Sequence, residues 1–464
     1  MLSVLGFGYR HAHPHEHLVF GKPNPTPSAT RSQASPSPGA TLDACPATYR
    51  EPYAYRPVMS LTFTLSQDFS TVTGHEQLTF VPDLPINEVY LRMWPNAPES
   101  TVNGAQMTIT AASLQGQSVT PQLSQSSTLV RLPLVKPVTG TATAVAVTTD
   151  FTFRLPHAGN DRFGYQPGLA WWGTGFPLLA YEPRHGWALE PPTSAFAETA
   201  TSQDMSVQLA VTAPSLDNEV IANGLSGQRT GATWSFSASS VRDVAVVVGS
   251  FTKALGFAAT GVPIQAYVAK GVTDIASQYV LDQTAAVNDH VHRLGPFPYP
   301  RLQSVTLPGV RGGIEYPGLI MYGANQHNAT PSHEVAHQWF YGLVGNDQAR
   351  DPWLDESLAT FIEALHRNHD YTTVAVPSAG LDKVGQPMSY WEPRTSTYFT
   401  SVYLQGADAL IKARNAVGAT AFDAALRCYV TSHAHQIATP GDFAGAFREL
   451  PAVIRTLREV GALR

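Results

Sequence analysis

The sequence predicts an α+β protein of more than one domain, in which an antiparallel β domain precedes a mainly helical domain. Three observations lead to this fold class. Apolar and polar residues alternate from about Tyr53 to Val248, helical periodicity prevails from about Asp274 onward, and a stretch rich in Pro, Ser and Thr precedes both regions. A chain of 464 residues is also long enough for two or three domains with separate cores.

Residues 1–44 are expected to form a disordered tail and linker. Four histidines at alternate positions from His11 to His17 could bind a metal loosely, and the alternative is that they belong to a mobile tail. Residues 21–41 contain almost no large apolar side chain that could form a core. Linkers of this kind often join an export signal or anchor to a folded domain. We therefore expect a location outside the cell or in the envelope of a bacterium, with the cytoplasm as the alternative.

Residues 45–255 are expected to form the antiparallel β domain. Runs such as SLTFTLSQ, EQLTFVP and MSVQLAVTAP alternate apolar and polar residues, and Gly, Pro, Asn and Asp separate them at short intervals. A loop rich in aromatic residues and proline, residues 157–196, interrupts the pattern. Its aromatic side chains either pack on neighbouring elements or line a substrate cleft, and the sequence leaves both possibilities open.

Residues 256–464 are expected to form the mainly helical domain. Residues 274–295 have apolar side chains three and four apart and end at a glycine, which is typical of a helix. Two short apolar stretches, LQSVTLPG and GGIEYPGLIMYG, interrupt the helical pattern as strands before further helices follow.

Composition excludes several classes of partner. The formal net charge is −6 and charged residues make up 14% of the chain, so we expect no binding of nucleic acid or of an acidic membrane surface. No apolar run is long enough for a transmembrane segment, and we expect a monomer. The two cysteines, Cys45 and Cys428, could pair or stay free, and two cysteines cannot make a four-cysteine zinc site.

The stretch HEVAH indicates a metal site. His333 and His337 stand four residues apart, so on a helix their imidazoles lie on one face and can share a cation. Glu334 lies about 100° round the helix from His333, close to the metal but free to hold a water molecule. The alternative is a solvated helix face that carries histidines by chance.

A catalytic zinc site needs a third protein ligand. A third histidine six residues after His337 is absent, because Leu343 stands there. The other arrangement takes a carboxylate from the next helix. Residues 338–355, 18 in all, separate His337 from Glu356, which would lie in the first turn of that helix. Asp355 is the rival ligand, and Glu363 is expected at the surface or behind the ligands.

These residues together resemble the gluzincin pattern of the aminopeptidase N (membrane alanyl aminopeptidase) family. H-E-x-x-H is followed after 18 residues by a glutamate within WLDESLA, GGIEYPG resembles the G-A-M-E-N motif, and YLQGADAL resembles the Y-x-K-G-A stretch. The resemblance also includes VRDVAVVVGS and covers roughly residues 50 to 450. It implies a saddle-like β domain, a thermolysin-like catalytic domain and one zinc ion per chain, held by His333, His337 and Glu356.

The resemblance also implies roles for further residues. Glu334 would be the general base, and Tyr403 would donate a hydrogen bond to the oxyanion, with Tyr398 as a weaker candidate. Glu315 would bind the α-ammonium group of a peptide with a free N-terminus. The residues before it, Gly312 and Gly313, would let the peptide backbone approach closely.

The resemblance leaves several points open. The family has a second acceptor for the substrate ammonium, for which Glu182 and Glu190 are weak candidates. Tyr316 replaces the Asn of the family motif and Gln405 replaces a usual Lys, which puts the substrate preference in doubt. The chain ends where many relatives continue into a helical domain, so we expect an open cleft. The leading hypothesis is a zinc aminopeptidase, and the alternatives are a zinc endopeptidase on the same scaffold and an inactive peptide-binding relative.

Overall fold

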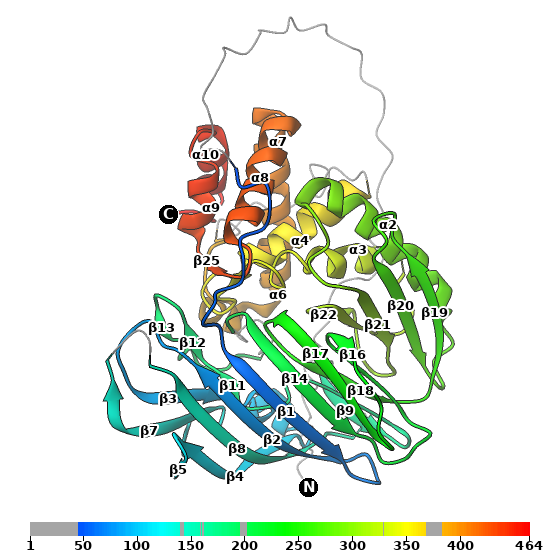
Figure 1. Ribbon diagram of the computed structural model, residues 1–464. Coiled ribbons are helices and arrows are strands. Elements are labelled where there is room, and N and C mark those ends of the chain that lie inside the picture. The colour runs from blue at the N-terminus through cyan, green and yellow to red at the C-terminus, as the bar shows by residue number, and fades with distance from the viewer. Residues whose placement is uncertain are drawn as a thin grey trace, which may run out of the picture.

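The computed structural model describes residues 45–464, with the exception of 140–142, 158, 160–161, 195–201, 328 and 368–382. The predicted tail and linker, residues 1–44, lie outside the described residues. Figure 1 shows the strands of the first half gathered at one end of the molecule and most of the helices at the other. None of the helices in these described ranges combines the length and the hydropathy that a membrane span requires.

The largest sheet of the β half has eight strands. Their order is β16-β17-β14-β1-β2-β8-β4-β5. The strands are β1 (Val58–Leu65), β2 (Thr71–Phe80), β4 (Gln106–Leu114), β5 (Gln117–Ser118), β8 (Val145–Arg154), β14 (Met205–Thr212), β16 (Leu225–Ser226) and β17 (Thr233–Val241). Residues of β1 are alternately exposed and buried, as the sequence pattern predicts for a strand with one face on the core.

One pairing in this sheet differs from the antiparallel expectation. β1 runs parallel to β14, with Val58 opposite Ser206, whereas the other pairings described in the sheet are antiparallel. Alternation of apolar and polar residues shows that a strand is half-buried, but it carries no information about the direction of a neighbour far away in the sequence. The sheet is therefore mixed.

Two four-stranded sheets complete the β half. One has the order β15-β18-β10-β9 and the other β11-β3-β7-β6. Their strands are β3 (Ile86–Arg92), β6 (Gln122–Ser124), β7 (Leu129–Val138), β9 (Phe163–Gln166), β10 (Leu169–Gly173), β11 (Leu178–Leu179), β15 (Glu219–Ala222) and β18 (Ala245–Gly249). Two further elements belong to the β half. The short helix α1 (Pro98–Thr101) follows β3, and a hairpin of β12 (Tyr181–Glu182) and β13 (Gly186–Trp187) follows β11.

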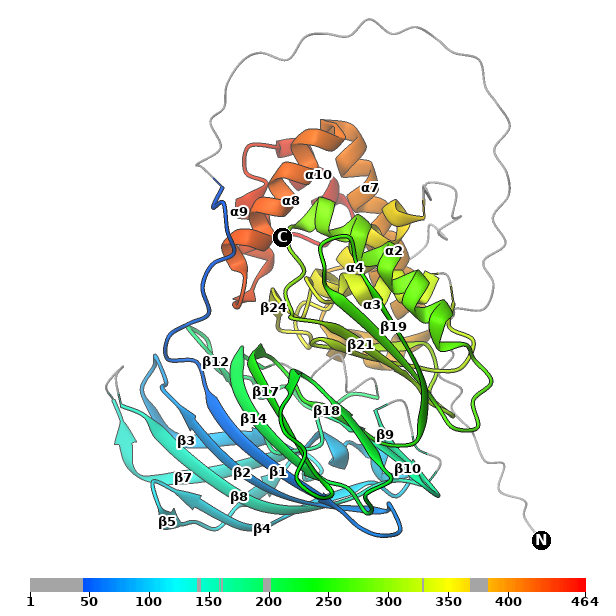
Figure 2. The ribbon, with the colours of Figure 1, turned by 45° about the vertical axis from the view of Figure 1, so that its right-hand side comes forward.

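The second half contains a five-stranded sheet and the larger helices. The sheet order is β19-β20-β21-β23-β22, so that β22 is an edge strand. The strands are β19 (Phe251–Phe257), β20 (Pro263–Ala269), β21 (Leu302–Thr306), β22 (Gly313–Tyr316) and β23 (Leu319–Tyr322). The predicted domain division after residue 255 falls inside β19. Helix α2 (Ala276–Leu294), predicted from periodicity, packs against β19 and β20, and Figure 2 shows it beside β19.

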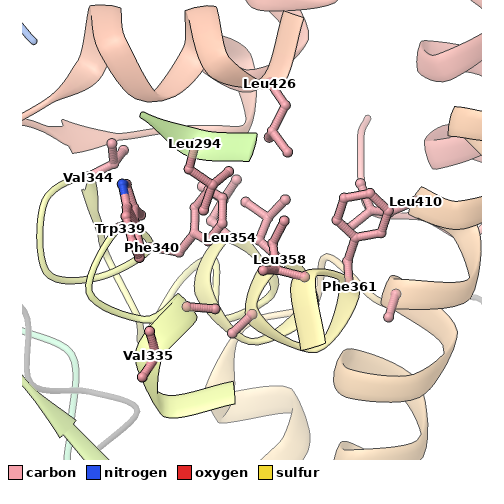
Figure 3. Packing of buried hydrophobic residues seen from close by; sticks show 14 of the residues in the cluster. Leu294, Val335, Trp339, Phe340, Val344, Leu354, Leu358, Phe361, Leu410 and Leu426 are labelled. Carbon is pink, nitrogen blue, oxygen red and sulfur yellow. The ribbon is translucent and has the colours of Figure 1, made fainter. Parts of the chain in front are cut away.

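The remaining helices follow the sheet along the chain. They are α3 (Ala329–Ala336), α4 (Trp353–His366), α5 (Met388–Trp391), α6 (Thr395–Tyr398), a π-helical segment (Phe399–Gln405), α7 (Gly406–Val417), α8 (Ala419–His433), α9 (Pro440–Ala446) and α10 (Pro451–Glu459). The two-residue strands β24 (Gly345–Asn346) and β25 (Ile437–Ala438) pair with each other. Figure 3 shows how Val335 of α3, Leu358 of α4, Leu410 of α7 and Leu426 of α8 enter one apolar cluster, which fixes these helices against one another.

A second apolar cluster joins the two halves. Trp171 and Val247 of the β half contact a group that includes Val305, Leu319 and Met321 of the five-stranded sheet, and all five side chains are buried. Because β10 and β18 are buried on both faces, their sequences are continuously apolar rather than alternating. The five-stranded sheet, and with it β22, is thereby held against the β half.

Arg242 makes a polar connection between the same two halves. It follows β17, is 1% exposed, and donates to the backbone oxygens of Gly342, Leu343, Gln436 and Ser202. A buried guanidinium without such acceptors would be strongly destabilising. The loop after α3 and the turn before β25 are therefore held by one side chain of the β half.

The buried carboxyl of Glu76 generates a prediction about stability. Glu76 lies in β2 on the core face of the eight-stranded sheet and accepts a hydrogen bond of 2.9 Å from Thr149 Oγ1. Burial raises the pKa of Glu76 to about 8, so the folded state keeps the proton at a pH where the unfolded chain has lost it. Stability is highest below the unfolded pKa and falls as the pH rises toward the folded pKa, by at most about 1.4 kcal/mol per pH unit.

We expect Glu76→Gln to remove this dependence, because the amide carries no titrating proton. In urea unfolding, the free energy of unfolding of the variant relative to that of the wild type should increase between about pH 5 and about pH 8. The exposed Glu51→Gln change is the control and should follow the wild type at both values. A constant difference between Glu76→Gln and the wild type across this range would contradict the buried, protonated carboxyl.

Candidate metal centre

Three side chains from two helices converge on one point in the second half of the chain. The Nε2 atoms of His333 and His337 are 3.0 Å apart, and Glu356 Oε2 lies 3.2 Å from the first and 3.3 Å from the second. All three residues are buried, with exposed fractions of 4% or less. They form one of two groups of His and carboxylate side chains with metal-ligand spacing in the described ranges.

The local fold explains this convergence. His333 lies in α3, and His337 follows the last residue of that helix but continues its spiral, since His337 N donates to His333 O at 3.3 Å. Glu356 lies in the first turn of α4, where a carboxylate also complements the helix dipole. Val335 of α3 and Leu358 of α4 belong to one buried apolar cluster, which holds the two helices together.

The dimensions of this triangle fit a zinc ion. Tetrahedral zinc with ligand bonds of about 2.0–2.1 Å requires ligand atoms about 3.3 Å apart. The observed separations are 3.0, 3.2 and 3.3 Å. Two imidazoles and a carboxylate are also the donor set that zinc takes in one class of catalytic site. The residues present therefore fit the metal that the sequence predicts.

Further contacts fix which ring nitrogen faces the centre. His337 Nδ1 donates to Phe340 O at 3.2 Å, so in the neutral ring that a metal requires, the proton lies on Nδ1 and Nε2 can bind the cation. His333 Nδ1 faces Glu363 Oε2 at 3.4 Å, an ion-pair contact that is long for a hydrogen bond. Glu363 is 5% exposed and also pairs with Arg367, so it lies behind the ligand rather than at the surface.

The pKa values of the three side chains are shifted because the side chains lie close to one another. Burial opposes the charged form of each residue, but the neighbouring carboxylates of Glu356 and Glu363 outweigh it and hold the pKa of His333 well above its ordinary value. Against burial, the charge of Glu356 raises the pKa of His337 to about 9. Against burial, His337 and His333 hold the pKa of Glu356 well below its usual range. Glu356 is therefore anionic and available to a metal ion, which would bind in place of the protons that the two imidazoles hold without it.

Asp355, the rival ligand, has a different position. Its Oδ2 accepts from Gln348 Nε2 at 2.9 Å, and its Oδ1 accepts from the backbone N–H of Glu356 at 2.8 Å. Both oxygens are thus engaged away from the histidines. The structure brings Glu356 and not Asp355 into the group, and gives Asp355 the task of holding the start of α4.

Glu334 lies beside the group and is 3% exposed. Burial, opposed by the charge of His333, raises the pKa of its carboxyl to about 8, and the charge of Glu315 acts in the same direction as burial. Its side chain lies against Gly313 of β22, where an added Cβ would stand 2.6 Å from Glu334 Oε1. Gly313 therefore makes room for Glu334 itself, which the sequence did not reveal. Gly312 adopts a φ of 65°, a conformation that favours glycine.

Glu315 and Tyr316 belong to the edge strand β22. Glu315 is 9% exposed, so it is nearly buried but still accessible. Tyr316, which departs from the family motif, extends to the β half, where Arg162 Nη1 donates to its hydroxyl at 3.2 Å. A Cβ on Gly173 would stand 1.9 Å from that hydroxyl, so this glycine leaves the space that the larger side chain occupies.

Tyr403 lies in the π-helical segment and stacks on a ligand. Its ring centroid is 5.9 Å from that of His333, with 11° between the ring planes. Tyr398 contacts Tyr403 edge-on from 5.8 Å, so it supports Tyr403 rather than replacing it. Segments of π-helix occur often at functional sites because they re-aim a side chain.

Two residues that sequence reasoning missed position this segment. Ser357, next to Glu356, donates from its Oγ to Val402 O at 2.6 Å. A Cβ on Gly406 would stand 2.1 Å from Ser357 Oγ, so only glycine lets α7 approach α4 this closely. The glycine in YLQGADAL was visible in the sequence, but its partner on α4 was not.

Glu182 and Glu190, the candidates for a second ammonium acceptor, make their described contacts elsewhere. Arg350 lies 3.4 Å from Glu182 Oε2 and 2.7 Å from Glu190 Oε1, and it also pairs with Asp347. Burial, together with the neighbouring Asp347, raises the pKa of Glu182 to about 9. These carboxylates form an ion cluster around Arg350.

The second group with metal-ligand spacing consists of Asp289, His290 and His366. Arg293 already donates to both oxygens of Asp289, at 3.0 and 3.1 Å. His290 Nε2 donates to Ser332 O at 2.9 Å. The contacts of this group link α2, α3 and α4 through an ion pair with an arginine, whereas no arginine or lysine pairs with Glu356 among the described contacts.

Comparisons with known proteins show what this chain is similar to. Residues 287–460 match the model of the family described as the peptidase family M1 domain. The chain is 24% identical over 232 residues to Aminopeptidase M1 of Arabidopsis thaliana, a match that covers 43% of this chain and 26% of that protein. It is 29% identical over 146 residues to Endoplasmic reticulum aminopeptidase 2 of Bos taurus, which covers 28% of this chain and 15% of that protein.

Solved structures show the same fold over most of the chain. The M1 zinc metallopeptidase of Deinococcus radiodurans matches with a TM-score of 0.64 and 20% identity, covering 87% of this chain and 92% of that chain. A mutant of the same protein bound to a Tyr-Ser-Ala substrate matches with a TM-score of 0.65 and 20% identity, covering 88% and 94%. The curated relatives are longer, and the match covers about a quarter of the plant protein. Residues 287–460 of this chain thus match the peptidase family M1 domain, and the chain has the fold seen in the solved M1 zinc metallopeptidases.

Proposed function

We propose that this protein is a zinc-dependent aminopeptidase that hydrolyses the first peptide bond of substrates with a free N-terminus. His333, His337 and Glu356 would hold one zinc ion per chain. The observation that carries the proposal is the buried triangle of their ligand atoms, with sides of 3.0–3.3 Å, beside the carboxylate of Glu334. The similarity to aminopeptidases of plant and animal origin supports it.

Zinc in such a site polarises the scissile carbonyl and lowers the pKa of water toward 7. Glu334 would accept the proton of the attacking water and later transfer it to the leaving amine. Its carboxyl is buried against Gly313, which restricts its position. A general base is most effective when its pKa lies near the working pH, and the burial of Glu334 acts in that direction.

Tyr403 would stabilise the negative charge that develops on the carbonyl oxygen. Its ring is held parallel to that of His333, and Tyr398 and Phe399 pack on it from behind. A hydroxyl held in this way donates a hydrogen bond without first having to be ordered. One such donor contributes about 3 kcal/mol to the stability of the transition state.

Glu315 would select peptides with a free N-terminus. It lies in β22, whose outer edge is free of a neighbouring strand in the described sheet, so an extended peptide could pair with this edge. The nearly buried carboxylate would then accept the substrate ammonium, which requires a charged partner when it leaves water. Tyr316 is the next residue of β22, and its packing against the β half would help to fix the position of Glu315.

Glu363→Gln tests the outer contact of the metal centre. We expect zinc affinity to fall about 10- to 100-fold, because the carboxylate that orients His333 becomes a neutral amide. Competition with a chromogenic chelator measures this affinity. The exposed Glu459→Gln change on α10 is the matched control and should bind zinc as the wild type does. Wild-type affinity in Glu363→Gln would show that His333 does not depend on this contact.

Glu334→Gln tests the general base. The amide keeps the shape of the side chain, so we expect one zinc ion per chain to be retained while hydrolysis of an aminoacyl anilide falls by at least about 10²-fold. Zinc content and turnover are measured on the same preparation. A fully active variant would refute the assigned base, and the loss of zinc together with activity would leave the metal centre rather than the base as the cause.

Blocking the substrate N-terminus tests Glu315. We expect a dipeptide amide with a free N-terminus to be cleaved about 10- to 100-fold more efficiently than its N-acetyl form, since acetylation removes the charged partner of Glu315. In the Glu315→Gln variant, the difference in cleavage efficiency between the free and the N-acetyl substrate should be smaller. Equal cleavage of both forms by the wild type would exclude an aminopeptidase and indicate an endopeptidase.

A further inference from the structure

The only two cysteines of the chain lie together in the fold, although 382 positions (residues 46–427) separate them in the sequence. Cys428 belongs to α8, and the thiol of Cys45 lies close enough to it for the two thiols to interact. Both side chains are half-buried, so they are accessible to a small oxidant.

The segment that carries Cys45 is fastened beside α8. Arg50 N donates to Thr431 O at 3.0 Å, which places the segment alongside the same part of α8 that holds Cys428. Tyr49 donates to Pro296 O at 2.5 Å and accepts from Trp339 Nε1 at 3.0 Å. In Figure 1 this segment is drawn in dark blue, passing α8 before it enters β1. The two thiols are therefore held near each other rather than meeting by chance.

We propose that Cys45 and Cys428 form an intramolecular disulfide that ties the segment before β1 to helix α8. The segment contacts the helices of the second half and continues directly into β1 of the first half. A cross-link at Cys45 would therefore resist separation of the two halves as well as fraying of the segment. The gain in stability is expected to be large because the cross-link closes a long loop of the unfolded chain.

The chemistry requires a disulfide oxidant such as oxidised glutathione. One cysteine thiolate attacks this disulfide, releases one glutathione thiolate and leaves a mixed disulfide. The second thiolate then attacks the protein sulfur of the mixed disulfide and releases the other glutathione. Two protein thiols are oxidised and one glutathione disulfide is reduced to two glutathione molecules.

The environment of Cys45 predicts when this reaction is slow. Burial and the adjacent thiol of Cys428 raise the pKa of Cys45 to about 12, against the opposing charge of Arg427. Because the thiolate is the attacking species, exchange that begins at Cys45 is slow near neutral pH and accelerates in alkaline buffer. A stable cross-link of this kind belongs in an oxidising compartment, which agrees with the expected location outside the cell or in the cell envelope.

The test uses the full-length chain, purified with a phosphine reductant and then incubated with a buffer of oxidised and reduced glutathione at about pH 8.5. After denaturation, free thiols are counted, the intact mass is measured, and the peptides are mapped. We expect no free thiols, a mass lower by two hydrogen atoms, and one peptide pair that joins Cys45 to Cys428. The thermal midpoint should rise by about 5 °C or more, and the reductant should reverse this rise.

A relocated cysteine is the matched control. Cys45→Ser combined with Thr48→Cys keeps one thiol in the same segment but moves it to an exposed position. This variant should remain uncross-linked under the same conditions. Two persistent thiols, a glutathione adduct on either cysteine, or disulfide-linked dimers in the wild type would overturn the proposal. None of these readouts depends on peptidase activity, so the result stands apart from that of the proposed function.

Discussion

The structure depends on the close approach of two imidazoles and one carboxylate in a buried place. Such an arrangement is costly without a cation, because burial disfavours the charged form of all three residues. The chain nevertheless enforces it from several directions. Phe340 O and Glu363 fix the two rings, Asp355 holds the start of α4, and apolar packing between α3 and α4 sets the distance. A fold that confines these groups so tightly is organised around the ion that they fit.

The β half contributes to the centre although it supplies none of the three ligands. Arg242 holds the loop that follows α3 by its backbone oxygens, and Gly173 leaves the space for Tyr316 beside Glu315. The apolar cluster around Trp171 fixes the five-stranded sheet that carries β22. The contacts between the two halves therefore set the position of the edge strand β22 relative to the three ligand residues.

Much of this could be predicted from the sequence because the relevant signals are local. Spacing alone brings His333 and His337 onto one face, and the short connection to the next helix limits the third ligand to Asp355 or Glu356. The resemblance, not the spacing, favoured Glu356, and the structure shows why Asp355 is excluded, since both of its oxygens are occupied. Alternation and helical periodicity likewise predict the two kinds of region because each strand or helix carries its own pattern.

The remainder depends on contacts between distant residues, for which a single sequence carries no signal. The parallel pairing of β1 with β14, the contact of Gly406 with Ser357, and the meeting of Cys45 and Cys428 all join residues far apart in the chain. Glu182 and Glu190 illustrate the opposite case. As acidic residues in an aromatic loop they were reasonable candidates for binding an ammonium, but their described partner is the guanidinium of Arg350.

Anomalous X-ray diffraction from crystals grown with zinc, collected on both sides of the zinc absorption edge, tests the central claim most directly. The account predicts a single strong peak about 2.0–2.2 Å from His333 Nε2, His337 Nε2 and a carboxylate oxygen of Glu356. The absence of a peak among these three residues, or a peak only at another position such as the group of Asp289, His290 and His366, would contradict it.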